Sequence, residues 1–332
     1  MLGSCHRGWF IHSSGFIKGL VLVWLLLVSL PGVLPAQGSP LRTVASIPPL
    51  GDFLRQIGGP AVQVEVLVAP GQNPHVLNFK PSQLRLLDSA QVLVLNGLGL
   101  EFWSEKLVAS LENPRLIVVR CGEGLPGSMD HQEIRKNQHK DQAGHREKDP
   151  DGGEHEGEAH SDHGGLDPHV WLDPVFAREM VGCVRDGLIR ANPEQKTLYQ
   201  QRAQAYAHRL DALHEEFSRV LAPARGRTIV SFHEGYGHLA RRYGLRDLGV
   251  VAGFTDMEPT PGRLARVIGE VRRLGVKVIF AEPQFSSRSA QVIGQETGAR
   301  VAYLDPLGGA EGEGYESMMR RNLAELRKAL LE

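Results

Sequence analysis

Two short segments of the chain place a histidine directly after an Asx-Pro pair. Proline fixes its own φ near −65° and keeps the residue before it out of the helical region, so each histidine follows a stiff turn. Imidazole is the commonest metal ligand in proteins, and the two turns, about a hundred residues apart, suggest two halves of one metal site. The two segments are Asn73-Pro74-His75 and Asp167-Pro168-His169.

Two further candidate ligands follow predicted strands in the second half of the chain. His233 comes directly after the segment 227–232, and Asp305 comes directly after the segment 300–304. In open α/β sheets, ligands bind at the carboxyl ends of the strands. Three imidazoles and one carboxylate make a full tetrahedral set for zinc. We therefore predict a closed zinc site formed by His75, His169, His233 and Asp305.

Glu282 and Trp171 are expected next to these ligands. Glu282 follows the predicted strand 276–280, where it either supports a ligand from outside the coordination sphere or caps the helix after Pro283. Bonding across the interface between the two halves is a further alternative for this carboxylate. Trp171 follows His169 by two residues and is most simply a core residue that separates the site from water.

The segment His233-Glu234-x-x-x-His238 resembles the HExxH motif of zinc proteases, but its histidines are five residues apart. Five residues turn a helix by about 500°, so the two side chains would point about 140° apart. The protease interpretation therefore fails on geometry. A more general zinc hydrolase with Glu234 as its base remains an alternative, but it needs an open metal position, which four protein ligands close. We predict a binding protein without enzymatic activity.

Residues 122–166 form a predicted disordered insertion without apolar periodicity, in which glycine, acidic residues and histidine dominate. A solvated surface loop with incidental histidines is the simpler interpretation, but the density of histidine favours an auxiliary, low-affinity metal site. The insertion either collects metal or senses the abundance of zinc, and the sequence leaves both roles open. Its histidines are His131, His139, His145, His155, His160 and His163, six of the 14 in the chain.

The first 36 residues have the order of a secretory signal peptide. Basic residues precede the apolar segment 19–30, Pro31-Gly32 ends it, and small residues follow around Ala36. The apolar segment of about a dozen residues is shorter than the roughly 20 that a spanning helix needs. We predict export to the periplasm and cleavage near Ala36, with an uncleaved membrane anchor as the alternative. Because no cysteine follows the apolar segment, a lipoprotein anchor is not expected.

Length, charge and cysteine content set further bounds. A chain of 332 residues exceeds one hydrophobic core, which predicts two domains. A formal net charge of −1 gives no reason to propose nucleic acid as a partner. Cleavage would remove Cys5 and leave Cys121 and Cys183. One bridge between them is permitted in an oxidising compartment, but we predict two buried free thiols.

Strands and helices alternate along both halves, which predicts an α/β fold with a mainly parallel sheet in each of two lobes. The expected lobes are residues 41–191 and 225–332, joined by one long helix within residues 193–222, with the metal site in the crevice between the lobes. Roughly 28 helical residues at about 1.5 Å each span about 40 Å, enough to run along a whole domain. The predicted strands are 42–47, 62–68, 91–95, 115–119, 227–232, 249–252, 276–280 and 300–304.

Five motifs in this order resemble those of one protein family: residues 71–75, 167–174, 232–237, 280–284 and 304–307. From Leu41 to Leu331 the chain resembles the metal-specific periplasmic solute-binding proteins of ATP-binding-cassette importers, the zinc and manganese group that is also described as adhesin-like. The resemblance implies two α/β lobes joined by a long helix, with the metal between them. It also implies a monomer that delivers its metal to a membrane permease with an associated ATPase.

The resemblance places the ligands at His75, His169, His233 and Asp305 and favours zinc. Zinc-selective members resemble this chain in the histidine at the third ligand position and in the His-rich acidic loop. Manganese-selective members tend to carry a carboxylate at that position, which fits the preference of manganese for harder ligands. A manganese-specific protein of this type and a metal-dependent adhesin are the alternatives. The usual aromatic-acidic pair after the first histidine is replaced by Leu77-Asn78, which removes one carboxylate near the site.

Overall fold

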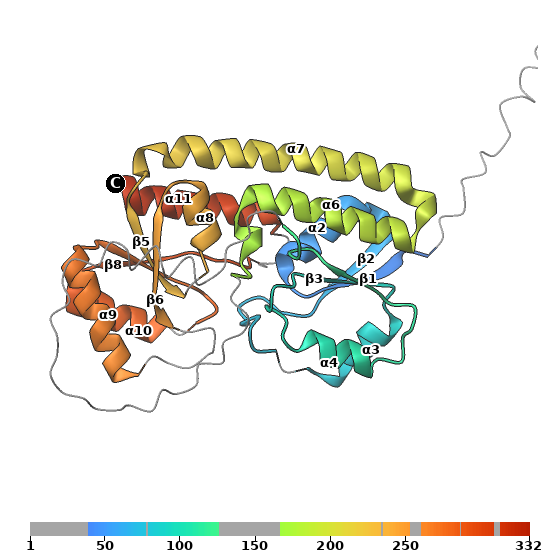
Figure 1. The fold of residues 1–332 in the computed structure, drawn as a ribbon, viewed down its shortest axis with the longest axis horizontal. Helices are drawn as coiled ribbons and strands as arrows, with labels where there is room; N and C mark the ends of the chain where they lie inside the picture. The colour runs from blue at the N-terminus through green and yellow to red at the C-terminus, as the bar shows by residue number, and fades with distance from the viewer. Residues whose placement is uncertain are drawn as a thin grey trace, which may run out of the picture. The chain divides into compact units, whose positions relative to one another are not determined.

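The computed structural model contains two β-sheets that lie under one long helix (Figure 1). Both sheets belong to one unit, residues 40–332. The predicted signal peptide and all six histidines of the predicted insertion lie outside the residues that the structure describes. Within the described part of the chain, no helix is both long enough and apolar enough to span a bilayer. The described residues are 39–77, 79–125, 167–233, 235–252, 260–285, 287–308 and 313–332.

The first sheet has four strands, all paired in parallel, in the order β2-β1-β3-β4. Helices cover both of its faces, so its inner strands must be apolar on both sides, and all of β3 is buried. The strands are β1 (Leu41–Ala45), β2 (Val62–Val66), β3 (Val92–Leu95) and β4 (Ile117–Arg120).

The second sheet repeats this arrangement with four parallel strands in the order β6-β5-β7-β8. Each of the eight predicted strands is present, with ends that differ by up to three residues. The predicted fold of two lobes with parallel sheets is therefore confirmed. The strands of the second sheet are β5 (Thr228–His233), β6 (Arg246–Ala252), β7 (Val278–Ala281) and β8 (Arg300–Tyr303).

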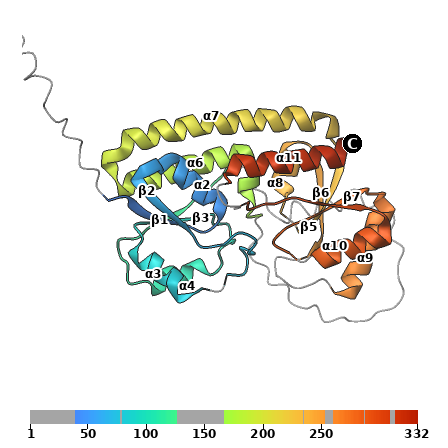
Figure 2. The same cartoon turned by 180° about the vertical axis from the view of Figure 1, so that it is seen from behind.

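Helices lie on both faces of each sheet (Figures 1 and 2). On the first sheet, α2 (Pro48–Gly58) and α6 (Pro174–Ala191) lie on the side of the long helix, and α3 (Pro81–Ser89) and α4 (Ser104–Ser110) lie on the other. The second sheet has α8 and α11 on the side of the long helix and α9 and α10 on the other. Their bounds are α8 (Gly237–Arg242), α9 (Pro261–Leu274), α10 (Ser287–Thr297) and α11 (Tyr315–Leu331).

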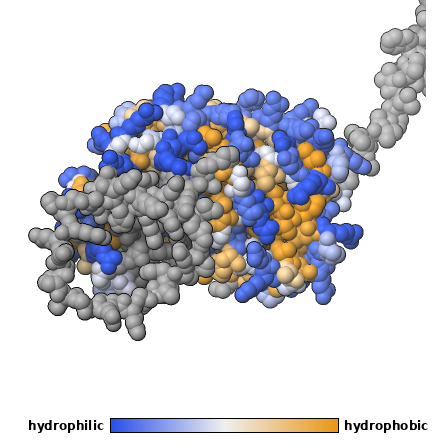
Figure 3. Space-filling view, in the orientation of Figure 1, coloured by the Kyte–Doolittle hydropathy of each residue, from blue (hydrophilic) through white to orange (hydrophobic). Residues whose placement is uncertain are grey.

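The long helix, α7 (Lys196–Leu221), packs against α6, α2 and α11 and so contacts helices of both lobes (Figure 2). Its buried side chains recur every three or four residues, which places them on one face of the helix. Polar residues cover its outer side in the view of Figure 3. The predicted joining helix is confirmed, although its first turn is a separate 3-10 turn at Pro193–Gln195. The buried residues are Tyr199, Ala203, Tyr206, Leu210, Leu213, Phe217 and Leu221.

Two helix starts show how the sequence sets the elements beside the site. Asp173 caps α6, as its position before Pro174 predicts: its Oδ1 accepts a hydrogen bond from the Val175 amide at 2.9 Å. Helix α2 begins at Pro48, the first of two consecutive prolines. Proline is favoured in the first turn because its missing amide proton has no partner there in any case. The pair Pro48-Pro49 therefore starts α2 in addition to ending the preceding strand.

Candidate metal centre

His75 lies in the loop that follows β2, and its backbone is fixed by the turn that the sequence predicts. Asn73 Oδ1 accepts a hydrogen bond from the His75 amide at 2.8 Å. Asparagine commonly makes this bond to the backbone two residues further on, and it stabilises a turn. The His75 ring is half-buried, so it can meet both the lobe interior and an incoming ion.

His169 follows the second Asx-Pro pair and is held at two points by one carboxylate. Asp167 Oδ1 lies 2.9 Å from the His169 amide nitrogen and 2.8 Å from Nδ1 of its ring. Both side chains are buried. A carboxylate on one ring nitrogen keeps the proton there and turns the other nitrogen toward a metal, which also makes that nitrogen a better ligand. The second Asx-Pro-His turn therefore fixes both the backbone and the ring.

His233 is the last residue of β5 and comes from the second sheet. Its Nδ1 lies 2.8 Å from Glu282 Oε1, just beyond the end of the neighbouring strand β7. Burial alone would lower the pKa of His233, but the charge and hydrogen bond of Glu282 outweigh it and raise that pKa above its usual value. Glu282 thus orients this ring as Asp167 orients His169, and leaves Nε2 for a ligand.

A glycine makes room for the His233 ring. A Cβ atom on Gly235 would lie 2.7 Å from Cε1 of His233 and 3.5 Å from Cδ2 of His169. The first distance is too short for any side chain, because the close neighbour belongs to a buried and hydrogen-bonded ring. Gly235 is therefore required for the position of the His233 ring, whereas the distance to His169 is an ordinary contact.

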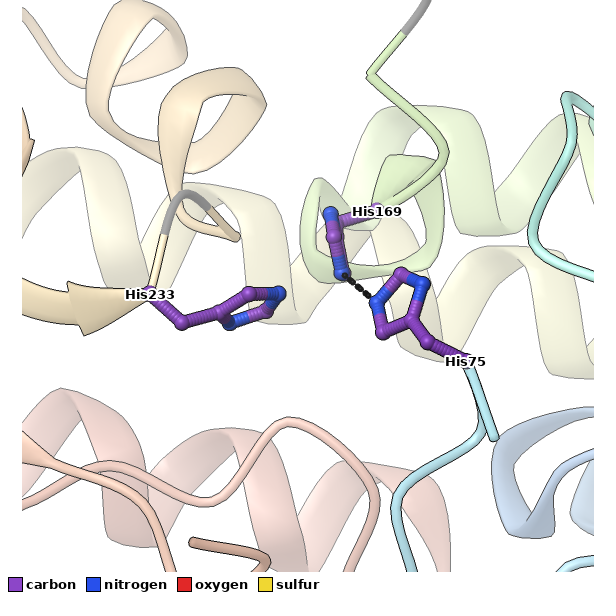
Figure 4. Close-up of side chains that lie close together, drawn as sticks. All are labelled: His75, His169 and His233. Carbon is purple, nitrogen blue, oxygen red and sulfur yellow. Dashed lines mark hydrogen bonds between the residues drawn. The ribbon is translucent and has the colours of Figure 1, made fainter. Parts of the chain in front are cut away.

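The three imidazoles converge on one point between the lobes (Figure 4). One nitrogen of each ring lies within 4.8 Å of the others, and the Nε2 atoms of His75 and His169 are 3.2 Å apart. Zinc–nitrogen bonds of about 2.0–2.1 Å in a tetrahedron separate two ligand nitrogens by about 3.3 Å. His75 and His169 thus have nearly the spacing of two zinc ligands, and a small inward movement of His233 would complete the triad.

Asp305, the fourth predicted ligand, does not belong to this group within the described residues. Its Oδ1 accepts hydrogen bonds from the Leu307 and Gly308 amides at 3.1 and 2.9 Å and from the Gln284 side chain at 2.9 Å. Its Oδ2 lies 3.2 Å from the Arg321 guanidinium. The carboxylate would have to give up some of these partners to reach a metal. Its role as a ligand stays a prediction.

Trp171 and Phe285 form an apolar wall of the same pocket, together with Pro306 and Leu307. The Trp171 ring lies 5.3 Å from that of His169, centroid to centroid, and is fully buried. Its Nε1 donates a hydrogen bond to the Pro306 carbonyl at 2.7 Å, which ties the segment carrying His169 to the segment that follows Asp305. The wall lowers the local dielectric constant and limits the access of water.

His238, the second histidine of the segment that resembles a protease motif, lies outside the triad. It is buried, its Nε2 lies 3.0 Å from the Asp167 carbonyl oxygen, and its ring contacts Phe176. The geometric argument against a protease motif therefore agrees with its position. Glu234 and the six histidines of the insertion lie outside the described residues.

Sequence reasoning missed two residues that hold the ligands. Asp167 and Asn73 entered it only as the residues before a proline, although each also binds the histidine amide two positions on. The Asx-Pro-His pattern itself indicates these two hydrogen bonds, because asparagine and aspartate side chains accept such bonds from the backbone in turns. Gly235 also supports the site, because its lack of a side chain admits the His233 ring.

A protein-family model described as "ZnuA: Zinc-uptake complex component A periplasmic" matches residues 43–329. The chain belongs to this family. Zinc-binding lipoprotein AdcA of Streptococcus pneumoniae is 28% identical over 313 residues, an alignment that covers 92% of this chain and 58% of AdcA. The chain thus spans little more than half the length of this curated relative.

Solved structures of related proteins have the same fold. A crystal structure of ZnuA matches with a TM-score of 0.71 at 27% identity and covers 87% of this chain and 99% of its own. A ZnuA deletion mutant with zinc bound matches with a TM-score of 0.70 at 28% identity, over 88% and 98% of the two chains. The laminin-binding protein Lmb of Streptococcus agalactiae, described as bifunctional in adhesion and metal transport, has a TM-score of 0.70 at 25% identity, over 87% and 98%.

Proposed function

We propose that this protein captures zinc in the periplasm and delivers it to the membrane permease of an ATP-binding-cassette importer with its ATPase. The observation that carries the proposal is the convergence of three imidazoles from two lobes, with the two Nε2 atoms of His75 and His169 already at the spacing of zinc ligands. A site shared by two lobes binds and releases an ion as the lobes approach and separate. Such a site suits transport better than permanent storage.

The chemistry of the ligands supports zinc as the transported ion. Imidazole nitrogens suit zinc, whereas manganese prefers carboxylate, carbonyl and water oxygens. The two carboxylates closest to the rings, Asp167 and Glu282, are both engaged with histidine Nδ1 atoms. Relatives described as zinc-binding support the same choice. Membership in a family of uptake components favours transport over a zinc hydrolase.

The proposed ligands are His75, His169 and His233, with Asp305 as the candidate for the fourth position. If Asp305 stays with its present partners, water or another small ligand fills that position instead. Asp305→Asn separates the two cases because the amide oxygen keeps a hydrogen-bond acceptor for Leu307 and Gly308 while the charge is removed. Weaker zinc binding at unchanged stability would assign Asp305 as a ligand, and unchanged affinity would assign water.

The remaining proposals concern the organisation of the chain, including segments that the structure does not describe. Residues 1–36 are proposed as the signal peptide that directs export, and residues 41–191 and 225–332 as the two lobes. The histidines of the insertion are proposed as a weaker, auxiliary zinc site. All of these assignments follow from the sequence pattern.

Calorimetric titration of the metal-stripped mature protein with zinc and, separately, with manganese tests the proposal. We expect one tight zinc event, weaker zinc events from the insertion, and much weaker manganese binding. Manganese binding as tight as zinc binding would replace zinc by manganese in the proposed function. A protein that binds zinc tightly but turns over a hydrolytic substrate would refute a pure transport role.

A further inference from the structure

Cys121 and Cys183 occupy matching positions where β4 and α6 pack together. Cys121 follows the last residue of β4 and continues its ladder, since its amide donates a hydrogen bond to the Leu95 carbonyl at 2.9 Å. Cys183 lies in the middle of α6, the helix that covers this part of the sheet. Cys121 is buried, Cys183 is partly exposed, and both are free thiols in the structure.

The helix and the strand run in opposite directions at close range. A Cβ atom on Gly187 would lie only 2.7 Å from Cγ2 of Val119, so the backbone of α6 rests directly on β4 there. Val170, which precedes α6, lies against Gly122 beyond the other end of the contact. Gly122 comes after Val119 along the strand, whereas Val170 comes before Gly187. The two segments are therefore antiparallel.

This geometry brings the two cysteines level with each other. Cys183 lies four residues before Gly187, or about 6 Å along a helix, and therefore on nearly the same face. Cys121 lies two residues after Val119, or about 6.6 Å along a strand, and also on the same face. Because α6 and β4 run in opposite directions, the step from Gly187 to Cys183 and the step from Val119 to Cys121 lead to the same end of their contact. Each of the two thiols shifts the pKa of the other, which agrees with this placement.

The two thiols differ in reactivity because their surroundings differ. Burial raises the pKa of Cys121 well above its usual value. The neighbouring Cys121 thiol, acting as a hydrogen-bond donor, lowers the pKa of Cys183, which is also the more exposed of the two. The thiolate is the reactive form of cysteine, so Cys183 is the thiol that attacks an external reagent first.

We propose that Cys121 and Cys183 form a disulfide in the exported protein. The Cys183 thiolate attacks one sulfur of an oxidant that itself contains a disulfide, and releases the other sulfur as a thiolate. The Cys121 thiol then loses its proton and attacks Sγ of Cys183, displacing the second sulfur of the oxidant. Two cysteine thiols are oxidised to one disulfide, the oxidant is reduced to two thiols, and the thiol protons pass to the departing thiolates.

The bridge would link two segments that lie on either side of the predicted His-rich insertion. It would close a loop of roughly 60 residues that contains His169, and a closed loop of this length restricts the unfolded chain substantially. It would also hold α6, whose N-terminal cap follows His169 by four residues, against the first sheet. The oxidised lobe would therefore unfold at a higher temperature than the reduced lobe.

The test starts with the exported wild-type protein, denatured and alkylated with iodoacetamide before any reductant is added. We expect no alkylated cysteine and an intact mass about 2 Da below that of the reduced protein, the mass of two hydrogens. After reduction, both cysteines should be alkylated, and peptide mapping of the unreduced sample should yield a linked Cys121–Cys183 peptide. The reduced protein should close the same bridge again in oxidised glutathione.

Variants distinguish a bridge from two unreactive thiols. Cys121→Ser should leave Cys183 open to alkylation without reductant. Reductant should lower the melting temperature of the wild type by several degrees. It should not change the melting temperature of the Cys121→Ser, Cys183→Ser double variant. Alkylation of both thiols in the unreduced wild type, together with failure to close the bridge in oxidised glutathione, would overturn the proposal. Zinc titration of the same samples reports on the proposed function separately.

Discussion

The residue two positions before each proline-linked histidine determines how that histidine is presented. Asn73 and Asp167 bind the backbone of their histidines in the same way, and Asp167 also binds the ring of His169. A carboxylate on Nδ1 orients the ring and makes the other ring nitrogen a better ligand. The backbone and the ring of His169 are therefore both held in place before any metal binds.

Loss of one imidazole should abolish the tight site. His169→Ala replaces a buried, oriented ligand by a methyl group, which leaves the zinc with two of its three nitrogens. We expect zinc affinity to fall at least about 100-fold by calorimetry. His208→Ala, which removes an exposed histidine of α7, is the matched control and should leave affinity unchanged. Full-strength binding by the His169 variant would refute the site assignment.

The carboxylate behind His233 should contribute to affinity without touching the metal. Glu282→Gln keeps the size of the side chain and an oxygen that can accept from His233 Nδ1, but it removes the negative charge. Replacement of such supporting groups typically weakens metal binding about 10–100-fold. Glu270→Gln, at a surface carboxylate paired with Arg273, should have no effect in the same titration. Equal affinities of the two variants would show that the charge of Glu282 does not act on the site.

At the scale of the elements, one buried carboxylate connects three helices. Asp52 of α2 accepts hydrogen bonds from the Tyr206 hydroxyl of α7 at 3.0 Å and from the Tyr315 amide of α11 at 3.1 Å. Tyr206 and Tyr315 both pack around Phe53, the neighbour of Asp52. Since α2 belongs to the first lobe and α11 to the second, this contact fixes the long helix to both.

Removal of this carboxylate should destabilise the whole unit. Asp52→Ala leaves two buried donors without an acceptor, and each costs about 1–3 kcal/mol. We expect a loss of about 3 kcal/mol in the free energy of unfolding, measured by urea denaturation with circular dichroism. Asp211→Ala, at an exposed ion pair of α7, should change it by less than about 0.5 kcal/mol. A similar small change in both variants would show that the helices do not depend on Asp52.

Local patterns predicted the elements, whereas contacts between distant segments could not be predicted. The strand 91–95 and the long helix within residues 193–222 follow from local sequence patterns, and both are present. The pairing of Glu282 with His233 and the packing of α6 on β4, which places Cys183 level with Cys121, depend on how strands and helices align in space. A single sequence contains no periodicity that sets such alignments, so the sequence argument left both open.

The His-rich insertion should add binding capacity but not the tight site. The described imidazoles of the triad come from outside residues 130–163, so deletion of that segment leaves all of them in place. We expect calorimetry of the deletion variant to show fewer zinc ions bound per protein, with one tight event retained. Complete loss of tight binding would mean that the insertion supplies a primary ligand, and the fourth position would then belong to it.

For the whole molecule, the site joins elements that share no strand pairing within the described residues. His75 and His169 belong to the lobe of the first sheet, His233 ends a strand of the second, and the two sheets have the same strand order. An ion bound to all three histidines therefore adds a link between the lobes that the metal-free protein lacks. Under the proposed function, release would require the lobes to separate, since no single lobe carries the complete triad.

Zinc should therefore stabilise the folded protein by mass action. An ion at about 100 times its dissociation constant adds about 2.7 kcal/mol to the free energy of unfolding if it binds the unfolded chain negligibly. For a unit of this size that corresponds to a rise of roughly 5 °C in melting temperature, which calorimetry or dye-based melting can follow. The variant without residues 130–163 should show the same rise, whereas His169→Ala should show almost none. If His169→Ala were stabilised as much as the wild type, zinc would be acting through the insertion or the surface, and the triad would not be the site that links the lobes.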